Sequence, residues 1–143
     1  MNDKDEQFQY WLADMHDALE RFRARLASGS GESLDMSPVS LLALESMLID
    51  RYAFSREALV PASASFIDGA ARYVGQTFRR ALGGTWFIDN VDKKNAFVGL
   101  PQLTGLSGQQ TQICPLTLVT SSLARRTGSH MYKVLRNMSD DPR

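Results

Sequence analysis

Apolar residues recur every three or four positions through residues 4–27, which is the spacing of one face of an α-helix. The polar residues between them are mainly acidic in the first half and basic in the second, an order that suits the helix dipole. We therefore predict a helix over residues 4–27 and expect the Gly/Ser-rich residues 28–31 to end it as a flexible joint. Its apolar face consists of Phe8, Leu12, Met15, Leu19, Phe22 and Leu26, and Trp11 widens it.

A second helix is predicted from its start signals. Ser37 is a favourable N-cap, and Pro38 occupies the first helical position, where the missing N–H costs nothing. Apolar residues continue the helical spacing from Leu41 to Tyr52. Their breadth around the helix predicts burial on more than one side.

A third helix is expected from Pro61 to about Leu82. Two glycines, Gly69 and Gly75, weaken it by roughly 1 kcal/mol each relative to alanine, unless they let a neighbouring segment come close. The Gly-Gly pair at 83–84 predicts an abrupt end, because glycine readily adopts a positive φ. The inner face of this helix is Phe66, Ile67, Ala70, Val74, Phe78 and Leu82.

The pattern then changes from helical to strand-like. Residues 85–89 are β-branched and aromatic, which predicts a strand. Residues 90–95 predict a polar turn and residues 96–100 a return strand, so that together they form a hairpin. Residues 101–112 predict a long loop rich in Gly, Gln, Ser and Thr, with a short third strand at 112–114 left open.

Pro115 begins a final predicted helix that Gly128-Ser129 is expected to break in two. The order of elements predicts an α+β fold: three N-terminal helices packed on a small antiparallel hairpin or meander and closed by the C-terminal helix. A chain of 143 residues with 43% hydrophobic and 22% charged residues fits one domain, 1–143, with residues 1–3 and 139–143 frayed.

Charge and cysteine content narrow the class of protein. The formal net charge is zero, from 16 basic and 16 acidic residues. Nucleic-acid binders usually carry a basic excess, so nucleic acid is an unfavoured partner. The single cysteine, Cys114, fits a reducing cytoplasm, and the chain shows neither a signal peptide nor an apolar run long enough to cross a membrane. These features predict a soluble cytoplasmic protein.

The sequence offers little catalytic chemistry. His16 and His130 lack metal-binding spacing, and Cys114 is expected to be a small buried residue. Phosphate-binding glycine motifs and a serine nucleophile elbow are also missing from the sequence. We therefore predict no catalytic residue, no metal site and no cofactor, and the question of enzymatic activity stays open with a preference against it.

Two arginine pairs are the most suggestive remaining feature. One pair closes the third predicted helix and the other lies in the last. Arginine is favoured near helix C-termini, but it is also enriched at protein interfaces, where it pairs with carboxylates. With a nearby aromatic residue, either pair could anchor an acidic partner protein. The candidate partner-binding residues are Arg79, Arg80, Trp86, Arg125, Arg126 and Tyr132.

One segment also resembles a known group of proteins. The run of residues 69–75, followed by Phe78 and then by the Gly-Gly-Thr-Trp of residues 83–86, is similar to small bacterial proteins of unknown function. In those proteins a helix rich in small residues runs into a Gly-Gly-x-Trp strand, and a proline-initiated helix follows. Some relatives look like immunity or accessory proteins found beside secreted toxins. The resemblance implies no catalytic residues.

These observations favour a non-enzymatic, protein-binding module of the bacterial cytoplasm, and the resemblance implies an immunity or accessory role. Two alternatives stay open. One is a small-ligand-binding protein or enzyme with a cleft between sheet and helices. The other is a nucleic-acid-associated regulator that uses the basic last helix. Homo-oligomer formation is compatible with all three.

Overall fold

The computed structural model describes residues 3–26, 34–109 and 111–140, and it confirms an α+β fold that is mainly helical. The helices and strands occur in the predicted order, with a two-stranded antiparallel sheet between helical segments. The elements, with η for 3-10 helices, are α1 (Asp3–Ala13), α2 (Met15–Ala24), α3 (Ser40–Arg51), η2 (Ser55–Leu59), η3 (Pro61–Ser63), α4 (Ala64–Leu82), β1 (Thr85–Phe87), β2 (Gln102–Thr104), α5 (Pro115–Arg125) and α6 (His130–Asp140).

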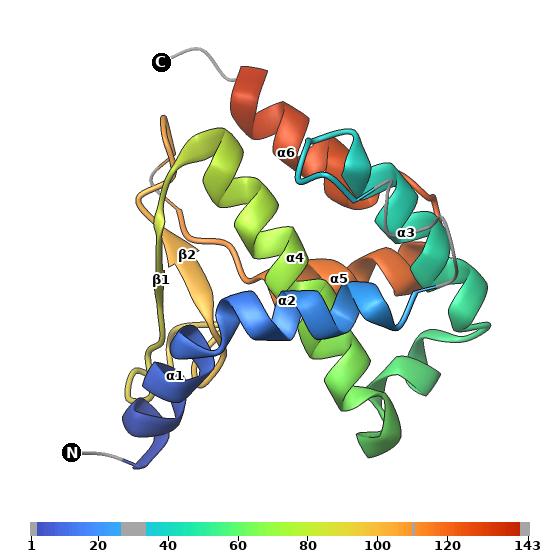
Figure 1. Cartoon of the computed structure of the whole chain (residues 1–143). Helices are drawn as coiled ribbons and strands as arrows, with labels where there is room; N and C mark the ends of the chain where they lie inside the picture. The colour runs from blue at the N-terminus through green and yellow to red at the C-terminus, as the bar shows by residue number, and fades with distance from the viewer. Residues whose placement is uncertain (1–2, 27–33, 110, 141–143) are drawn as a thin grey trace.

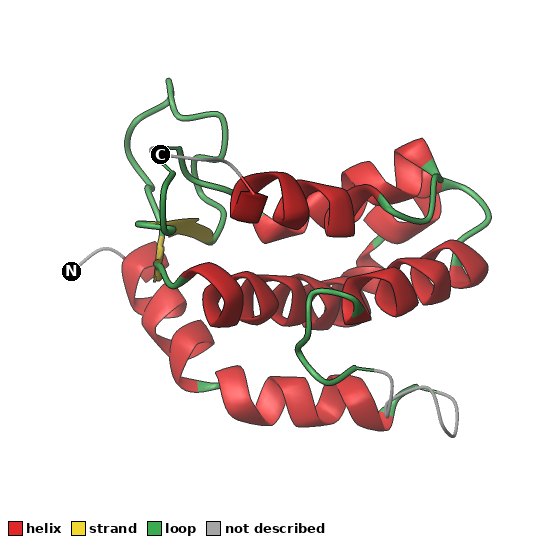
Figure 2. Ribbon diagram, turned by 90° about the horizontal axis from the view of Figure 1, so that it is seen from above, coloured by secondary structure: helices red, strands yellow, loops and turns green. Residues whose placement is uncertain are grey.

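Helix α4 is the centre of the fold. It packs against α2 on one side and against α5 and α6 on the other (Figure 2). Helix α3 lies beside α5 and α6, and the small sheet stands near the C-terminal end of α4 (Figure 1). Because neighbours surround α4, eleven of its nineteen residues are buried, far more than a one-sided amphipathic helix would bury.

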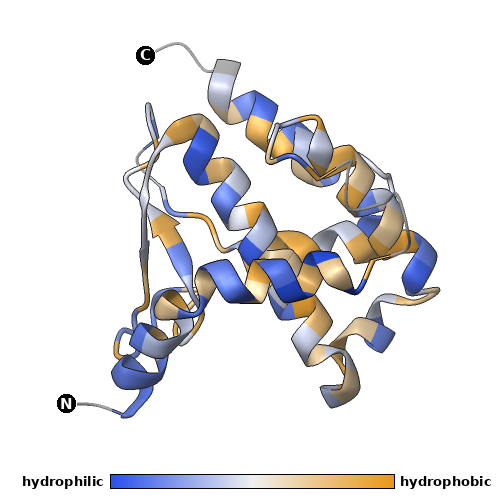
Figure 3. Cartoon of the chain, viewed as in Figure 1, coloured by the Kyte–Doolittle hydropathy of each residue, from blue (hydrophilic) through white to orange (hydrophobic). Residues whose placement is uncertain are grey.

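The hydrophobic core is continuous through these contacts. Hydrophobic residues gather where α4 and α5 cross, whereas α1 is mostly hydrophilic (Figure 3). Ala70, Val74 and Phe78 of α4 and Val119 and Leu123 of α5 are each fully buried in this core. The apolar face predicted for the third helix therefore includes the α4 residues that lie in this core.

The first predicted helix is two helices in the structure, because the chain bends at Asp14 between α1 and α2. At this bend the Trp11 carbonyl oxygen accepts a hydrogen bond of 2.8 Å from Nη1 of Arg72 in α4. The apolar spacing continues across the bend, so the sequence pattern gives no sign of it. The joint predicted at residues 28–31 lies outside the described residues, as do residues 1–2 and 141–143 of the predicted frayed ends.

Helix α3 begins close to its predicted start. The hydroxyl of Ser37 accepts the N–H of Ser40 at 3.2 Å, as an N-cap serine does. The first turn is tight, since the N–H of Ser40 also bonds to the carbonyl of Ser37, three residues back. The regular helix then runs from Ser40.

The predicted return strand at residues 96–100 is wrong. Strand β1 pairs instead with β2, which lies inside the segment predicted as a loop, and the possible third strand is reduced to one bridge between Ile113 and Leu103. The register is Thr85 with Thr104, Trp86 with Leu103 and Phe87 with Gln102.

Side chains that bind the local backbone explain this difference. Asp89 accepts the N–H groups of Val91 and Asp92, and Asn95 accepts that of Phe97, so residues 89–97 form successive turns. Such bonds compete with strand pairing. The fully buried Gln102 then donates to the Phe97 carbonyl at 2.9 Å and holds these turns against β2.

The expected break in the last helix is confirmed. Arg126 ends α5 in the left-handed region, with φ of 54°, and Gly128 follows with φ of 84°. The new start of α6 receives its cap from another helix: the fully buried carboxylate of Glu45 in α3 accepts the N–H groups of His130 at 3.1 Å and Met131 at 3.0 Å. Two N–H groups that would otherwise lack helical partners are thereby satisfied.

None of the helices in the described residues is both long enough and apolar enough to cross a membrane.

Candidate functional site

An apolar groove of about 570 Å³ opens on the surface of the described residues. It lies between α4, the first two turns of α5 and the η2–η3 segment, and the sheet side is closed by strand β1. Its lining residues are Trp11, Ala58, Leu59, Val60, Pro61, Ala64, Ile67, Asp68, Ala71, Trp86, Pro101, Pro115, Leu116, Thr117 and Thr120.

Local sequence accounts for the hollow. On this wall helix α4 presents the small side chains of Ala64 and Ala71 beside Ile67 and Asp68. Pro115 starts α5 at a position where its missing N–H costs nothing, and Pro61 does the same for η3. The groove is therefore walled by short or rigid apolar side chains, which do not fill the space between the elements.

Two tryptophans from distant parts of the chain meet at the groove. Trp11 of α1 and Trp86 of β1 stand edge to face, with ring centroids 4.9 Å apart. The indole N–H of Trp86 donates to Oε1 of Gln76 at 2.8 Å, and that of Trp11 donates to Oδ1 of Asp68 at 2.8 Å. Both rings are thus fixed by a hydrogen bond as well as by packing.

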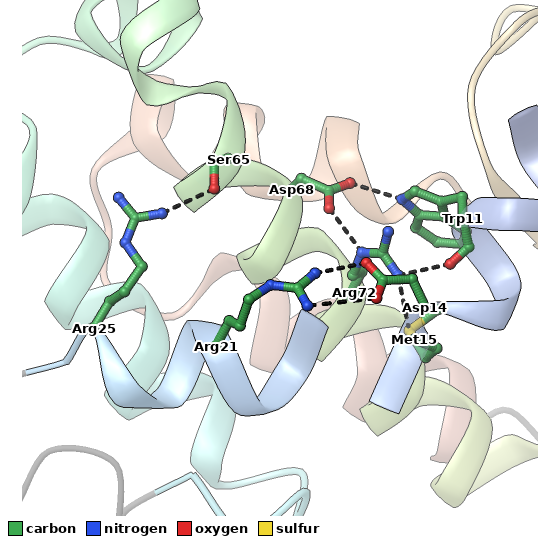
Figure 4. A network of polar contacts seen from close by, with 8 residues as sticks. All are labelled: Trp11, Asp14, Met15, Arg21, Arg25, Ser65, Asp68 and Arg72. Atoms are coloured by element: carbon green, nitrogen blue, oxygen red, sulfur yellow. Dashed lines mark hydrogen bonds and ion pairs between the residues drawn. The ribbon is translucent and has the colours of Figure 1, made fainter. Parts of the chain in front are cut away.

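Asp68 joins α4 to α1 in a network shown in Figure 4. Its Oδ2 accepts a hydrogen bond of 2.7 Å from Nε of Arg72, one helical turn later. The Arg72 side chain is only 4% exposed, and its guanidinium carbon stands 4.2 Å from the centre of the Trp11 ring. A buried arginine needs such partners, since its charge cannot be left without compensation.

A second ion pair lies at the edge of the same network. Arg21 of α2 approaches Asp14 to 2.6 Å, and both side chains are well exposed (Figure 4). The hydrogen bond from Arg21 lowers the pKa of the Asp14 carboxyl below its ordinary value. This pair orients the bend between α1 and α2 but lies outside the groove.

The groove has an exposed apolar rim. Leu59 is 68% exposed and Val60 46% exposed, and both line the groove where η2 meets η3. Large aliphatic side chains that are both exposed and adjacent to a hollow are typical of binding sites.

The structure places the first predicted arginine pair at the end of α4. Arg79 clamps the helix-to-strand turn: its Nε donates to the Gly84 carbonyl at 3.1 Å and its Nη1 to Oε1 of Gln76 at 3.0 Å. Arg80 is exposed and donates to the Asp35 carbonyl at 3.2 Å. Arg79 therefore holds its own chain together, and Arg80 is the more accessible member.

The second arginine pair divides in the same way. Arg126 donates to the carbonyls of Tyr52 at 2.9 Å and Ile49 at 3.0 Å, and so caps the C-terminal end of α3. Arg125 is exposed, and Tyr132 is partly buried against the core. The two pairs lie at the C-terminal ends of α4 and α5, and these two helix ends are well separated in Figure 1. The structure does not bring the four arginines into one surface, and of the six candidates only Trp86 lines the groove.

The two histidines and the cysteine considered for catalysis do not line the groove. His16 is exposed, and Cys114 carries a free thiol that is 1% exposed. Burial, and then the charge of Arg125, lower the pKa of His130 below its ordinary value, while Glu45 acts in the opposite direction. Within the described part of the chain, no cluster of three or more His, Cys, Asp or Glu residues could hold a metal ion.

The sequence pattern did not predict the network of Trp11, Asp68 and Arg72. Asp68 and Arg72 are four residues apart, which is the spacing of an ion pair on one helix face. That signal was present, but the pairing of this face with Trp11 depends on a contact across 57 residues.

Comparison with known proteins gives no further information on the site, because no family model, curated protein or solved structure matches the chain.

Proposed function

We propose that this chain is a non-enzymatic binding protein whose site is the apolar groove between α4, α5 and the η2–η3 segment, and that its ligand is a small apolar molecule. The observation that carries the proposal is the groove itself. Its volume of about 570 Å³ falls within the range of roughly 300–1,000 Å³ that is typical of small-molecule sites. Its lining is almost wholly apolar, with a few polar groups, as such sites require.

The chemistry of the lining supports binding over catalysis. Asp68 is the only acid or base among the lining residues, and both of its oxygens already accept hydrogen bonds from Trp11 and Arg72. His16, His130 and Cys114 do not line the groove. A general base must reach the proton that it removes, and no histidine or cysteine is placed to do so here.

The test is binding of a neutral apolar probe, N-phenyl-1-naphthylamine, whose fluorescence rises in an apolar site. Ala64→Trp fills the groove from α4 and should abolish the rise, because Ala64 is exposed and lines the groove. Ala62→Trp is the matched control: Ala62 is exposed two residues earlier and does not line it. Equal fluorescence from both variants, or none from the wild-type chain, would contradict the proposal.

Protein binding is a second candidate, supported by a different observation. Phe54, Leu59 and Val60 are 55%, 68% and 46% exposed within seven residues of chain. Exposed apolar residues gathered in one segment often mark protein interfaces. An immunity or accessory role in a bacterial cytoplasm, and an acidic partner for Arg80 and Arg125, stay predictions. For this role, Phe54→Ser should lose the partner protein but keep probe binding, because Phe54 is exposed and does not line the groove.

A further inference from the structure

Four side chains that line the groove, those of Trp11, Trp86, Thr117 and Thr120, use their hydrogen-bond donors inside the protein. The indole N–H groups of Trp11 and Trp86 are used by Asp68 and Gln76. An indole has one donor and no acceptor. Neither tryptophan can therefore offer a hydrogen bond to a ligand, although both present aromatic surface to it.

The two threonines on the α5 wall are in the same condition. The hydroxyl of Thr117 donates to the Cys114 carbonyl at 2.9 Å, and that of Thr120 donates to the Thr117 carbonyl at 3.2 Å. Each hydroxyl oxygen has two lone pairs that can still accept a hydrogen bond. Toward the groove, these side chains are acceptors.

Asp68 is the third acceptor and the only charged one. One oxygen accepts from Trp11 and the other from Arg72, but a carboxylate has about four acceptor sites. Its side chain is 44% exposed, whereas that of Arg72 is 4% exposed and covered by the Trp11 ring. Asp68 is also among the residues that line the groove, whereas Arg72 is not.

From this arrangement we infer that the ligand is an apolar amine, that is, a hydrocarbon or aromatic body with an ammonium group that donates to Asp68. The inference rests on the proposed function and adds the chemical class of the ligand. An ammonium forms a charge-assisted hydrogen bond with a carboxylate, which is about twice as strong as a neutral one. The apolar body gains free energy by leaving water for the groove.

A ligand of the opposite kind is disfavoured by the same residues. A carboxylate placed in the groove would lose hydration, and the side chains of Thr117, Thr120 and Asp68 would meet it as acceptors. It would also stand near the negative charge of Asp68. The groove should therefore discriminate against fatty acids and aromatic acids of the same size.

The experiment measures displacement of bound N-phenyl-1-naphthylamine by three ten-carbon compounds at neutral pH: decylamine, decan-1-ol and decanoate. Their apolar bodies are alike, so that differences report the polar end. Decylamine should bind tightest and decanoate weakest, with about a tenfold or larger ratio between them, as a charge-assisted hydrogen bond supplies. All three are used below the concentrations at which they form micelles.

A charge-removing variant tests whether Asp68 causes the preference for decylamine over decanoate. Asp68→Asn keeps the shape and one acceptor oxygen but loses the negative charge, so the ratio of decylamine to decanoate affinity should fall severalfold. Asp50→Asn removes an exposed acid from α3, outside the groove, and should leave the ratio unchanged. The wild-type ratio should also fall as salt is raised, because Asp68 is partly exposed.

The outcomes separate the two proposals. Decanoate binding as tightly as decylamine, or decylamine failing to displace a bound probe, would overturn the amine inference and leave the binding function standing. A ratio unchanged by Asp68→Asn in a folded variant would overturn it too. Failure of the probe itself to bind the wild-type chain overturns the proposed function instead.

Discussion

The indole of Trp86 lies directly against the backbone of Gly75. A Cβ placed on Gly75 would come within 2.1 Å of Cη2 of this ring and within 3.2 Å of Cγ of Pro115. The missing side chain is thus what lets strand β1 approach α4. Because Trp86 is also a wall of the groove, this close approach positions part of the candidate site.

We predict that Gly75→Ala destabilises the chain. In an unconstrained helix this change would stabilise by roughly 1 kcal/mol. Here the added methyl group collides with a ring held by Gln76, and such overpacking costs about 1–3 kcal/mol. Urea unfolding of both proteins measures the difference. If the variant is more stable than the wild type, the Trp86 ring moves aside without cost.

A double-mutant cycle shows whether Trp86 is the cause. With Trp86→Ala already present, Gly75→Ala should cost little or become favourable, because the methyl group no longer meets the ring. Free energies of unfolding that simply add across the cycle would place the conflict with another neighbour.

Glu45→Ala should destabilise α6 by about 1–3 kcal/mol or more, because the N–H groups of His130 and Met131 lose a buried acceptor. Hydrogen exchange at these two amides, together with thermal unfolding, measures the effect. Asp50→Ala is the control, since it removes an exposed acid from the same helix. Equal losses from both variants would show that Glu45 does not cap α6.

His130 makes stability depend on pH in a defined direction. Its pKa is lowered in the folded chain, so the unfolded chain binds this proton more readily. The contribution to stability is therefore complete above the unfolded value of about 6.5 and is lost as pH falls below it. Urea unfolding at pH 7.5 and pH 5 should show a smaller drop for His130→Gln than for the wild type. His16→Gln, at an exposed position, is the control that should keep the wild-type drop.

The adjacent residues Arg125 and Arg126 should respond differently to the same change. Arg126→Glu removes two hydrogen bonds to carbonyls at the end of α3, each made by a charged donor, so a loss of about 2–4 kcal/mol is expected. Arg125→Glu changes an exposed side chain and should stay within about 0.5 kcal/mol. Thermal unfolding of the two variants measures the difference. Equal stability would mean that the Arg126 cap on α3 does not contribute to the stability of the fold.

Local sequence patterns predicted most of the helices, but not the bend between α1 and α2 or the 3-10 helix η2. Periodic apolar spacing and start and stop residues act within a few positions along the chain, so that the end of α4 at Gly83 and the break before α6 could be predicted. Strand β2 could not, because strand pairing competes with local bonds. The side chains of Asp89 and Asn95 turn the expected return strand into turns, and pairing moves to a segment whose composition suggests a loop.

The candidate site depends on how the elements pack in three dimensions. The groove is the space left between elements, and its width depends on how closely α4, α5 and β1 approach each other. Its polar character depends on which donors are already used: the Trp11 indole N–H, for example, reaches Asp68 across 57 residues. Local sequence shows which side chains can donate or accept. The folded packing decides which of them still have a lone pair or a proton to offer.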